Sequence, residues 1–281
     1  MGKTGIAWTD YSWNPTTGCH KLSEECVNCY AETVSLNKGF SKLPWTATNA
    51  AENVVEHPER LNDPRRFNMG GQYSEQQPPR YPIKIFVDSM SDLFHDQVSD
   101  AFIEQVFGVM TDLAHRHRIF QIATKRPERA AKWPGPWTPN IWMGVTCGHY
   151  KSKPRIDVLR GCAAHVKFIS AEPLLTSLKP LDLTGIDWII AGGESGSGFR
   201  PMEMSWAREI RDEAVSQGTA FFYKQDAAGS NGQRKYLVEE DGSCWKWLQY
   251  PDYLIPPVQV APQNLKYHKK RFPLCVPSIT A

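Results

Sequence analysis

Short runs of apolar, β-branched and aromatic residues recur along the chain and predict the strands of a sheet. Six runs are clear, at residues 83–87, 119–123, 141–145, 166–169, 188–191 and 220–223. They are largely apolar at successive positions, which is typical of parallel strands that are buried on both faces. An earlier strand is expected at residues 5–8 or 11–14.

The segments between these runs have the periodicity of helices. Ser99 is a candidate N-cap, and apolar residues repeat at helical spacing behind it as far as Leu113. A second helix is predicted over residues 206–215, with Ser205 before it and Gly218 as its stop signal. Strands that alternate with helices in this way predict an α/β fold, either a barrel or an open doubly wound sheet.

Weaker helical signals lie at residues 50–61 and, despite Pro154, at residues 151–159. The first of them falls inside a polar insertion at about residues 40–80, which is rich in Pro, Asn, Gln and Arg. A loop of this length in a compact domain is usually functional or mobile.

Length and composition set the domain organisation. The chain has 281 residues, 41% of them hydrophobic, which is enough for one large domain or two small ones. We expect the α/β domain over residues 1–228 and a Pro-rich, basic extension over residues 229–281, with a hairpin near residues 240–243.

Charge and hydropathy bear on the cellular compartment of the protein and on its binding partners. The 32 Lys and Arg residues nearly balance the 30 Asp and Glu residues, so the net charge neither predicts nor excludes a nucleic-acid-binding groove. No apolar run approaches membrane-spanning length, and residues 1–6 lack the apolar core of a signal peptide. We therefore expect a cytoplasmic protein with reduced thiols and no membrane partner.

Three of the seven cysteines form the most informative motif in the chain. Cys19, Cys26 and Cys29 are separated by six and then two residues, a spacing that lets them grip one metal centre. Three thiolates suit a four-iron cluster with one iron left open, because ordinary ferredoxin-type clusters use four cysteines. A zinc site that adds His20 or a distant histidine fits the same spacing.

Polar residues begin where several of the predicted strands stop. In β/α barrels the active site is built on the carboxyl ends of the strands, so we expect these side chains to line one cavity. The residues are Asp88, Ser89, Ser91, Asp92, Thr124, Lys125, Arg126, Thr146, Glu172, Glu194, Ser195 and Lys224.

Several blocks of sequence, taken in order, carry a resemblance to a known family. They are residues 13–32, which contain the three cysteines, and residues 88–95, 124–129, 140–145, 170–175, 192–196 and 221–225. Together they resemble a phage- and prophage-borne family of unknown function that is grouped with radical S-adenosylmethionine (SAM) enzymes and is distantly similar to spore photoproduct lyase. The resemblance extends over roughly residues 4–228.

The resemblance implies a partial (β/α) barrel of the radical SAM type, with about six or seven mostly parallel strands. It implies a 4Fe–4S cluster on Cys19, Cys26 and Cys29, with SAM bound at the open iron and cleaved to a 5′-deoxyadenosyl radical. An external flavodoxin- or ferredoxin-like protein would supply the electron. The six-residue gap after Cys19 is longer than in the commonest radical SAM pattern, which has three residues there.

The same resemblance guides the roles expected of single residues. The expected SAM-binding residues are Tyr30, Asp88, Ser89, Ser91, Thr124, Thr146, Glu172, Gly192, Gly193, Glu194 and Ser195. Lys125, Arg126 and Lys224 are candidates for binding an anionic substrate, since Arg and Lys bind phosphate and carboxylate groups. Cys147, Lys125 and Glu172 are the candidate catalytic residues, Cys147 as a donor of a hydrogen atom. Helix capping, ion pairing and core packing are the structural alternatives for these residues.

The expected reaction is the modification or lyase-type repair of a nucleic-acid base, with DNA or a nucleotide as substrate and a phage-encoded protein as a possible partner. The alternative is a zinc- or cluster-bearing protein that binds nucleic acid or serves a partner without catalysis. Basic residues at 266–271 favour this alternative, whereas the row of polar strand ends favours an enzyme.

Overall fold

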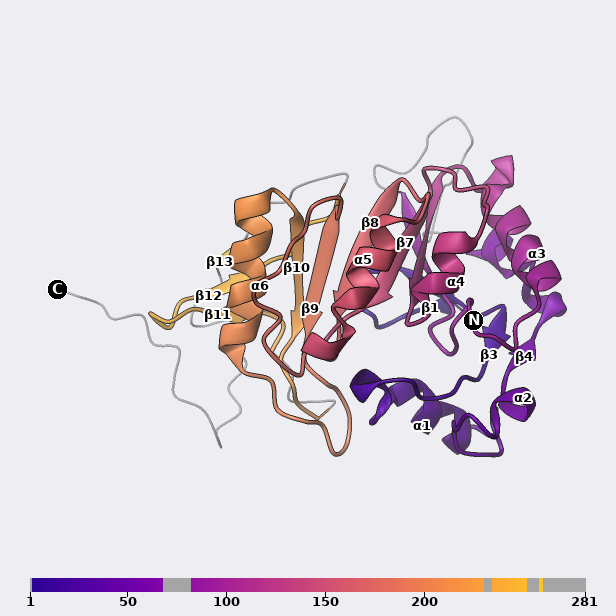
Figure 1. Ribbon diagram of the computed structural model, residues 1–281, viewed down its shortest axis with the longest axis horizontal. Helices are drawn as coiled ribbons and strands as arrows, with labels where there is room; N and C mark the ends of the chain where they lie inside the picture. Colours follow the sequence, from indigo (N-terminus) through magenta and orange to yellow (C-terminus); the bar gives the residue numbers. More distant parts are fainter. Residues whose placement is uncertain (1, 68–81, 230–233, 252–257, 260–281) are drawn as a thin grey trace. The chain divides into compact units, whose positions relative to one another are not determined.

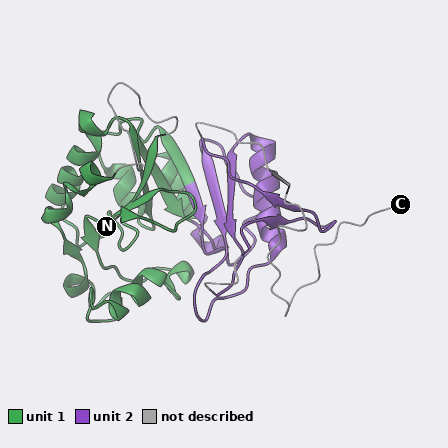
Figure 2. Cartoon of the chain, turned by 180° about the vertical axis from the view of Figure 1, so that it is seen from behind, with its two compact units in different colours: residues 1–146, 154–168 green, residues 147–153, 169–281 purple. Residues whose placement is uncertain are grey.

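The computed structural model describes residues 2–67, 82–229, 234–251 and 258–259. The chain divides into two compact units (Figure 2). The first comprises Met1–Thr146 and Pro154–Phe168, and the second Cys147–Lys153 and Ile169–Ala281. The predicted boundary at residue 228 falls inside the second unit. Residues 68–80 of the predicted insertion and the basic residues 266–271 lie outside the described residues.

The first unit is built on a mostly parallel sheet (Figure 1). Its strands are, in spatial order, β1 (Gly2–Lys3), β2 (Tyr11–Trp13), β5 (Ile83–Val87), β6 (Arg118–Thr124), β7 (Ile141–Thr146) and the first half of β8 (Val166–Ala171). Strand β1 is antiparallel to β2, and the pairs β2–β5, β5–β6 and β6–β7 are parallel. Tyr11, Ile85, Phe120 and Ile141 are partners at one level of this sheet and are buried.

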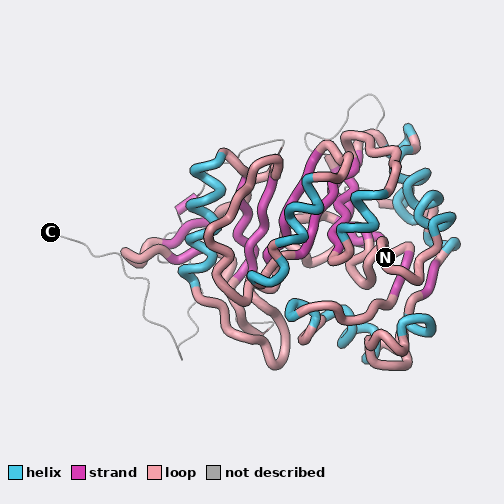
Figure 3. The backbone as a smooth tube through the Cα atoms, viewed as in Figure 1, coloured by secondary structure: helices cyan, strands magenta, loops and turns pink. Residues whose placement is uncertain are grey.

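Short helices and turns surround this sheet (Figure 3). They are α1 (Tyr30–Asn37), α2 (Ala50–Asn53), α3 (Asp100–Thr111), α4 (Pro127–Lys132) and α5 (Pro154–Arg160), with 3-10 turns at Glu24–Cys26, Pro58–Arg60, Asp63–Arg66 and Leu113–His115. A two-stranded ribbon joins β3 (Thr16–Thr17) to β4 (Val55–Glu56). Helices α4 and α5 contact each other, and α5 also packs on β7.

The second unit has its own parallel pair, β9 (Trp188–Gly192) and β10 (Ala220–Gln225), beside the second half of β8. Helix α6 (Met204–Gln217) packs on both β9 and β10, and a 3-10 turn lies at Tyr150–Ser152. A small antiparallel sheet contains β11 (Leu237–Val238), β12 (Cys244–Lys246) and β13 (Val258–Gln259). Pairing of β11 with β12 confirms the predicted hairpin.

The strand predictions are confirmed. All six apolar runs are strands, each within two residues of its expected ends, and the early strand is Tyr11–Trp13. The mixed α/β class with mostly parallel strands is therefore correct. No helix in the described part of the chain is long and apolar enough to cross a membrane.

The two stronger helices are confirmed, with corrected ends. The hydroxyl of Ser99 accepts a hydrogen bond from the Phe102 N–H at 3.2 Å and caps α3 as predicted. Leu113 lies beyond the end of α3 and is 79% exposed, so its place on the apolar face was wrong. Ser205 lies inside α6, which begins one residue earlier and ends at Gly218 in the left-handed conformation, with φ of 72°.

The two weaker helix predictions were only partly right. Of residues 50–61, Ala50–Asn53 form one α-helical turn, α2, and Pro58–Arg60 form a 3-10 turn; between them β4 pairs with β3, which competes with helix extension. Pro154 does not weaken its helix but begins it, and proline suits the first helical position because its missing N–H has no partner there.

The parallel strands determine where the functional segments meet. The cysteine segment follows β2 and β3, residues 88–96 follow β5, and residues 125–126 follow β6. Since β2, β5 and β6 are parallel neighbours, these three segments leave the sheet at the same edge.

Replacing two glycines of the first unit by alanine should change its free energy of unfolding in opposite directions. A Cβ at Gly144 in β7 would overlap the buried ring of Phe168, whereas nothing lies within 4 Å of a Cβ at Gly108 in α3. We expect Gly144→Ala to lower the free energy of unfolding by about 1–3 kcal/mol through overpacking. Gly108→Ala should raise it by about 0.5–1 kcal/mol through helix propensity.

Urea denaturation followed by circular dichroism measures both changes. If the Gly144→Ala variant were as stable as the Gly108→Ala variant, the described contact between β7 and Phe168 would be wrong.

Candidate functional site

The cysteine segment is joined to the segment after β5 by a short parallel bridge. The Gly18 N–H donates to the Met90 carbonyl at 3.0 Å, and the Ser91 hydroxyl donates to the Gly18 carbonyl at 2.6 Å. Gly18 has φ of +84°, and a Cβ there would collide with the Asn53 carbonyl, so only glycine fits. Cys19 is therefore held directly beside the carboxyl end of β5.

Local helices position the other two cysteines. Cys26 is buried at the end of a 3-10 turn, and Cys29 is the N-cap residue of α1. The buried carboxylate of Glu25 lies 3.6 Å from the Arg155 guanidinium, which also donates to the Thr146 carbonyl at 2.9 Å. This pair connects the cysteine segment to the carboxyl end of β7.

Asp92 is the hub of the site. Its carboxylate accepts hydrogen bonds from the Thr124 hydroxyl at 2.6 Å and from the Lys125 N–H and the Arg126 guanidinium, both at 3.0 Å. Burial of Asp92 disfavours its charge, but Arg126 and these hydrogen bonds outweigh burial and lower the pKa of the carboxyl. Asp92 is therefore an anion that joins the end of β5 to the end of β6.

Arg126 extends this network to the first cysteine. Its Nη1, which is bonded to Asp92, lies 3.6 Å from the Cys19 Sγ, and its Nη2 lies 3.3 Å from the His20 Nδ1. Burial and the Asp92 charge raise the pKa of the Cys19 thiol to about 12, and Arg126 acts in the opposite direction. Bound metal would compete with this proton, because a thiolate is the form that ligates metals.

Lys125 is the cation that all three cysteines share. Burial opposes its charge, but the charges of Cys26, Cys29, Asp92 and Cys19 outweigh burial and raise the pKa of Lys125. Burial likewise opposes ionisation of Cys26, and Lys125 together with nearby hydrogen bonds lowers the pKa of that thiol. The chain thus brings three thiols and two cations together at one edge of the first unit.

A pair of histidines lies against Arg126, and their hydrogen bonds determine their tautomers. The Gln97 N–H donates to the His95 Nδ1 at 3.0 Å, so neutral His95 carries its proton on Nε2. Burial, with Arg126, lowers the pKa of His95 to about 4 and keeps it neutral. Its Nε2–H must then donate to the His20 Nδ1 at 2.8 Å, which places the proton of neutral His20 on Nε2.

Asp88 directly follows β5 and contacts the ribbon strand β3. It has φ of 59°, and its carboxyl accepts a hydrogen bond from the Thr16 N–H at 3.0 Å. Burial raises the pKa of this carboxyl to about 8. Asp88 therefore holds the ribbon strand β3 in its protonated form at neutral pH.

Other predicted SAM-binding residues also take part in local contacts. The Tyr30 hydroxyl donates to the Ser89 carbonyl at 2.7 Å, and the Ser89 hydroxyl donates to the Asn14 side chain at 3.1 Å. Together with Ser91, they attach the cysteine segment and α1 to the end of β5. Their role in binding SAM stays a prediction.

The remaining predicted residues belong to the second unit. Lys224 and Glu172 form an ion pair at 3.2 Å, and Glu172 also lies beside the Cα of Gly192. Glu194 is buried and accepts hydrogen bonds from Arg200. The prediction of one cavity lined by the residues of both units stays a prediction.

Two further residues of the second unit have backbone roles. The Gly193 N–H donates to the Gln225 carbonyl at 2.8 Å, and Cys147 is fully buried with its N–H donating to Ser170 at 3.0 Å. Ser195 forms an isolated bridge with Ala228. The roles expected of these residues in cofactor binding and catalysis also stay predictions.

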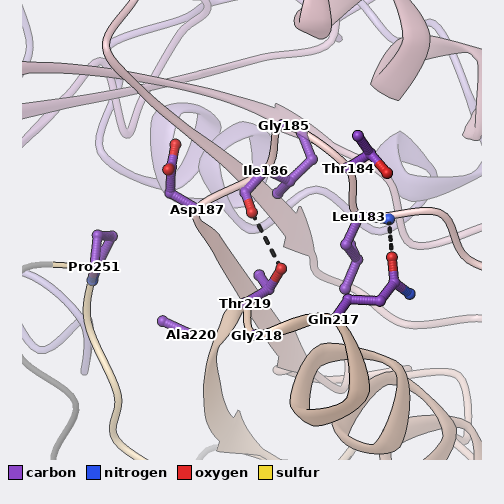
Figure 4. Close-up of a pocket in the computed structure, with 10 residues that line it drawn as sticks. All are labelled: Leu183, Thr184, Gly185, Ile186, Asp187, Gln217, Gly218, Thr219, Ala220 and Pro251. Atoms are coloured by element: carbon purple, nitrogen blue, oxygen red, sulfur yellow. Dashed lines mark hydrogen bonds between the residues drawn. The ribbon is translucent and has the colours of Figure 1, made fainter.

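A pocket in the second unit lies at the opposite end of β9 and β10 from Gly192, Gly193 and Lys224. It is lined by Leu183–Asp187, Gln217–Ala220 and Pro251, at the amino ends of β9 and β10 (Figure 4). Polar groups that line it are hydrogen-bonded to each other. The Gln217 side chain accepts from the Leu183 N–H at 2.8 Å, and the Thr219 hydroxyl donates to the Ile186 carbonyl at 3.1 Å. The expected functional groups occupy the opposite, carboxyl ends of these strands.

Sequence reasoning missed the Glu25–Arg155 pair and the hydrogen bond between His95 and His20. Nothing in the spacing of Arg155 distinguishes it from any other helical arginine. His95 had a weak signal, since it follows a predicted strand end in the segment that also carries Asp92. The hydrogen bond to His20 depends on contact between segments far apart in the chain.

The fold and site define an α/β protein with a thiol-rich site at the carboxyl edge of a parallel sheet. A family model, described as a protein of unknown function (DUF5131), matches residues 3–251, and the chain belongs to this family. No curated protein and no solved structure matches the chain.

The protonated state of Asp88 predicts a dependence of stability on pH. An unfolded Asp titrates near pH 4, whereas the pKa of folded Asp88 is raised to about 8. Between these values the unfolded chain releases a proton that the folded chain keeps. The contribution of Asp88 to the free energy of unfolding therefore falls as pH rises from about 4 to about 8.

Asp88→Asn should remove this dependence, because Asn is neutral, tolerates positive φ and can still accept from Thr16. Urea denaturation from pH 5 to pH 9 should show the variant gaining stability relative to wild type as pH rises. The exposed Asp157→Asn variant is the control and should run parallel to wild type. Parallel profiles for Asp88→Asn would exclude a buried, protonated Asp88.

Proposed function

We propose that Cys19, Cys26 and Cys29 hold a 4Fe–4S cluster and that the protein is an enzyme of the radical SAM type. The observation that carries the proposal is geometric: the Arg126 guanidinium, held by Asp92 at the carboxyl edge of the sheet, lies 3.6 Å from the Cys19 sulfur. Thiolate ligation concentrates negative charge, and Lys125 and Arg126 are positioned to compensate it.

The donor set fits such a cluster. All three cysteines are free thiols. Within the described residues, no group of three or more His, Cys, Asp and Glu side chains is already assembled as a site for a metal ion. The thiolates of a four-iron cluster bind separate irons. Three thiolates leave one iron open for SAM.

The tautomer of His20 argues against the alternative zinc site in which His20 joins the three cysteines. Its Nδ1 accepts from His95, so in the neutral ring Nε2 carries the proton. A metal needs a nitrogen with a free lone pair, and ligating histidines normally donate their other N–H to an acceptor. His20 has the opposite arrangement, because His95 faces it with a donor.

Cys19, Cys26 and Cys29 would hold the cluster, and its chemistry would be the one-electron reductive cleavage of SAM to methionine and a 5′-deoxyadenosyl radical. The chain's own residues bind, orient and exclude water. Asp92 holds Arg126 and the backbone of Lys125 in place, and Arg155 secures the cysteine segment at Glu25. The proposal includes closure of the sheet as a partial barrel.

Substrate and partner follow from the resemblance and belong to the same proposal. The substrate is a nucleic-acid base, and the electron comes from a flavodoxin- or ferredoxin-like protein. In the second unit, the Glu172–Lys224 pair and Gly192–Ser195 supply polar groups for SAM or substrate. At both glycines the chain's own groups already lie close to the backbone: a Cβ would meet the Glu172 carboxylate at Gly192 and the Ala227 backbone at Gly193.

Anaerobic reconstitution with iron and sulfide tests the cluster. Wild type should bind about four irons per chain, and reduction by dithionite with SAM should yield 5′-deoxyadenosine. Cys26→Ala should lose most of the iron because one ligand is missing. Cys244→Ala is the matched control, since Cys244 is buried in β12 of the second unit, and it should keep the full iron content.

His20→Ala separates the two metals. With a cluster on three cysteines, the variant should keep the iron content of wild type, whereas a zinc site that uses His20 would lose affinity for zinc. A colourless protein that binds zinc tightly, and loses it in His20→Ala, would overturn the proposal in favour of a zinc-bearing binding protein.

A further inference from the structure

The guanidinium of Arg126 makes direct contact with a proposed ligand sulfur. Its Nη1 lies 3.6 Å from the Cys19 Sγ, and the residue is 7% exposed. Cys26 has a different neighbour, the neutral hydroxyl of Ser23 at 3.8 Å. The Cys19 sulfur therefore contacts a charged donor, whereas the Cys26 sulfur contacts a neutral hydroxyl.

Asp92 prevents this donor from moving away. The same Nη1 is bonded to the Asp92 carboxylate at 3.0 Å, and the Arg126 N–H donates to the Thr124 hydroxyl at 2.9 Å. That hydroxyl itself donates to Asp92 at 2.6 Å. Rotation of the guanidinium would leave a buried carboxylate without its cation, which is strongly unfavourable.

These contacts occupy the Nη1 and Nη2 groups with which Arg126 would bind a substrate. Nη1 is engaged by Asp92 and Cys19, and Nη2 faces the His20 ring at 3.3 Å. A two-pronged contact with a substrate phosphate needs two free N–H groups directed the same way. The geometry favours a role directed at the cysteine.

A fixed donor on a ligand sulfur changes the reduction potential of a cluster. Reduction adds negative charge to the cluster and its thiolates, and hydrogen bonds and positive charge at the sulfurs stabilise that state. We infer that Arg126, held by Asp92, is a positioning residue that raises the reduction potential of the cluster through the Cys19 sulfur. The inference rests on the proposed function.

A redox titration of the reconstituted protein with dithionite, followed by electron paramagnetic resonance, tests the inference without measuring activity. Arg126→Gln should keep the iron and shift the reduction potential to more negative values. Arg126→Lys should shift it in the same direction but less, because it keeps the charge and a partner for Asp92 but not the planar fork. Lys132→Gln removes an exposed cation from the same region of chain and should leave the potential unchanged.

The outcomes separate this inference from the proposed function. Wild-type protein that binds no iron would overturn both. Iron-loaded Arg126→Gln and Arg126→Lys variants with the wild-type potential would overturn the role of Arg126 alone. An equal shift in Lys132→Gln would also overturn it, since the effect would then come from general charge. If Arg126→Gln fails to retain iron, the potential of Arg126→Lys decides.

Discussion

The buried carboxylate of Asp92 is the constraint on which the candidate site depends. A charge that is 5% exposed is costly unless it is neutralised and hydrogen-bonded. Asp92 satisfies this demand with Thr124, the Lys125 N–H and Arg126, all at the end of β6. Because Asp92 itself follows β5, one charge fastens two neighbouring strand ends together and also determines where the Arg126 guanidinium can lie.

The electrostatic character of the cysteines follows from this arrangement. The Arg126 guanidinium lies 3.6 Å from the Cys19 sulfur, and the preceding residue, Lys125, acts against burial to lower the pKa of the Cys26 thiol. The bridge between Gly18 and Ser91 brings Cys19 to the same strand edge. The three cysteines are thus brought to the strand edge that carries Lys125 and Arg126.

Much of the fold could be predicted because its signals are local. The apolar strands, the Ser99 cap and the Gly218 stop depend on residues close in sequence. Errors arose where pairing with a distant segment competed with a local helix. Strand β4 pairs with β3, and the helix predicted there therefore ends after one turn. The cysteine spacing and the polar strand ends likewise indicated a site, but the engagement of Arg126 by Asp92 and Cys19 had no local signal.

By itself, the sequence determined the alternation of strands and helices, the three-cysteine motif and the strand ends that carry its polar neighbours. These follow from hydrophobic periodicity and residue spacing, which depend on short stretches of chain. Only the tertiary structure decided that Lys125 and Arg126 face the thiols, that Asp88 is a buried acid, and that His95 directs the tautomer of His20. Burial and contact between distant segments set these properties, and neither is a property of the local sequence.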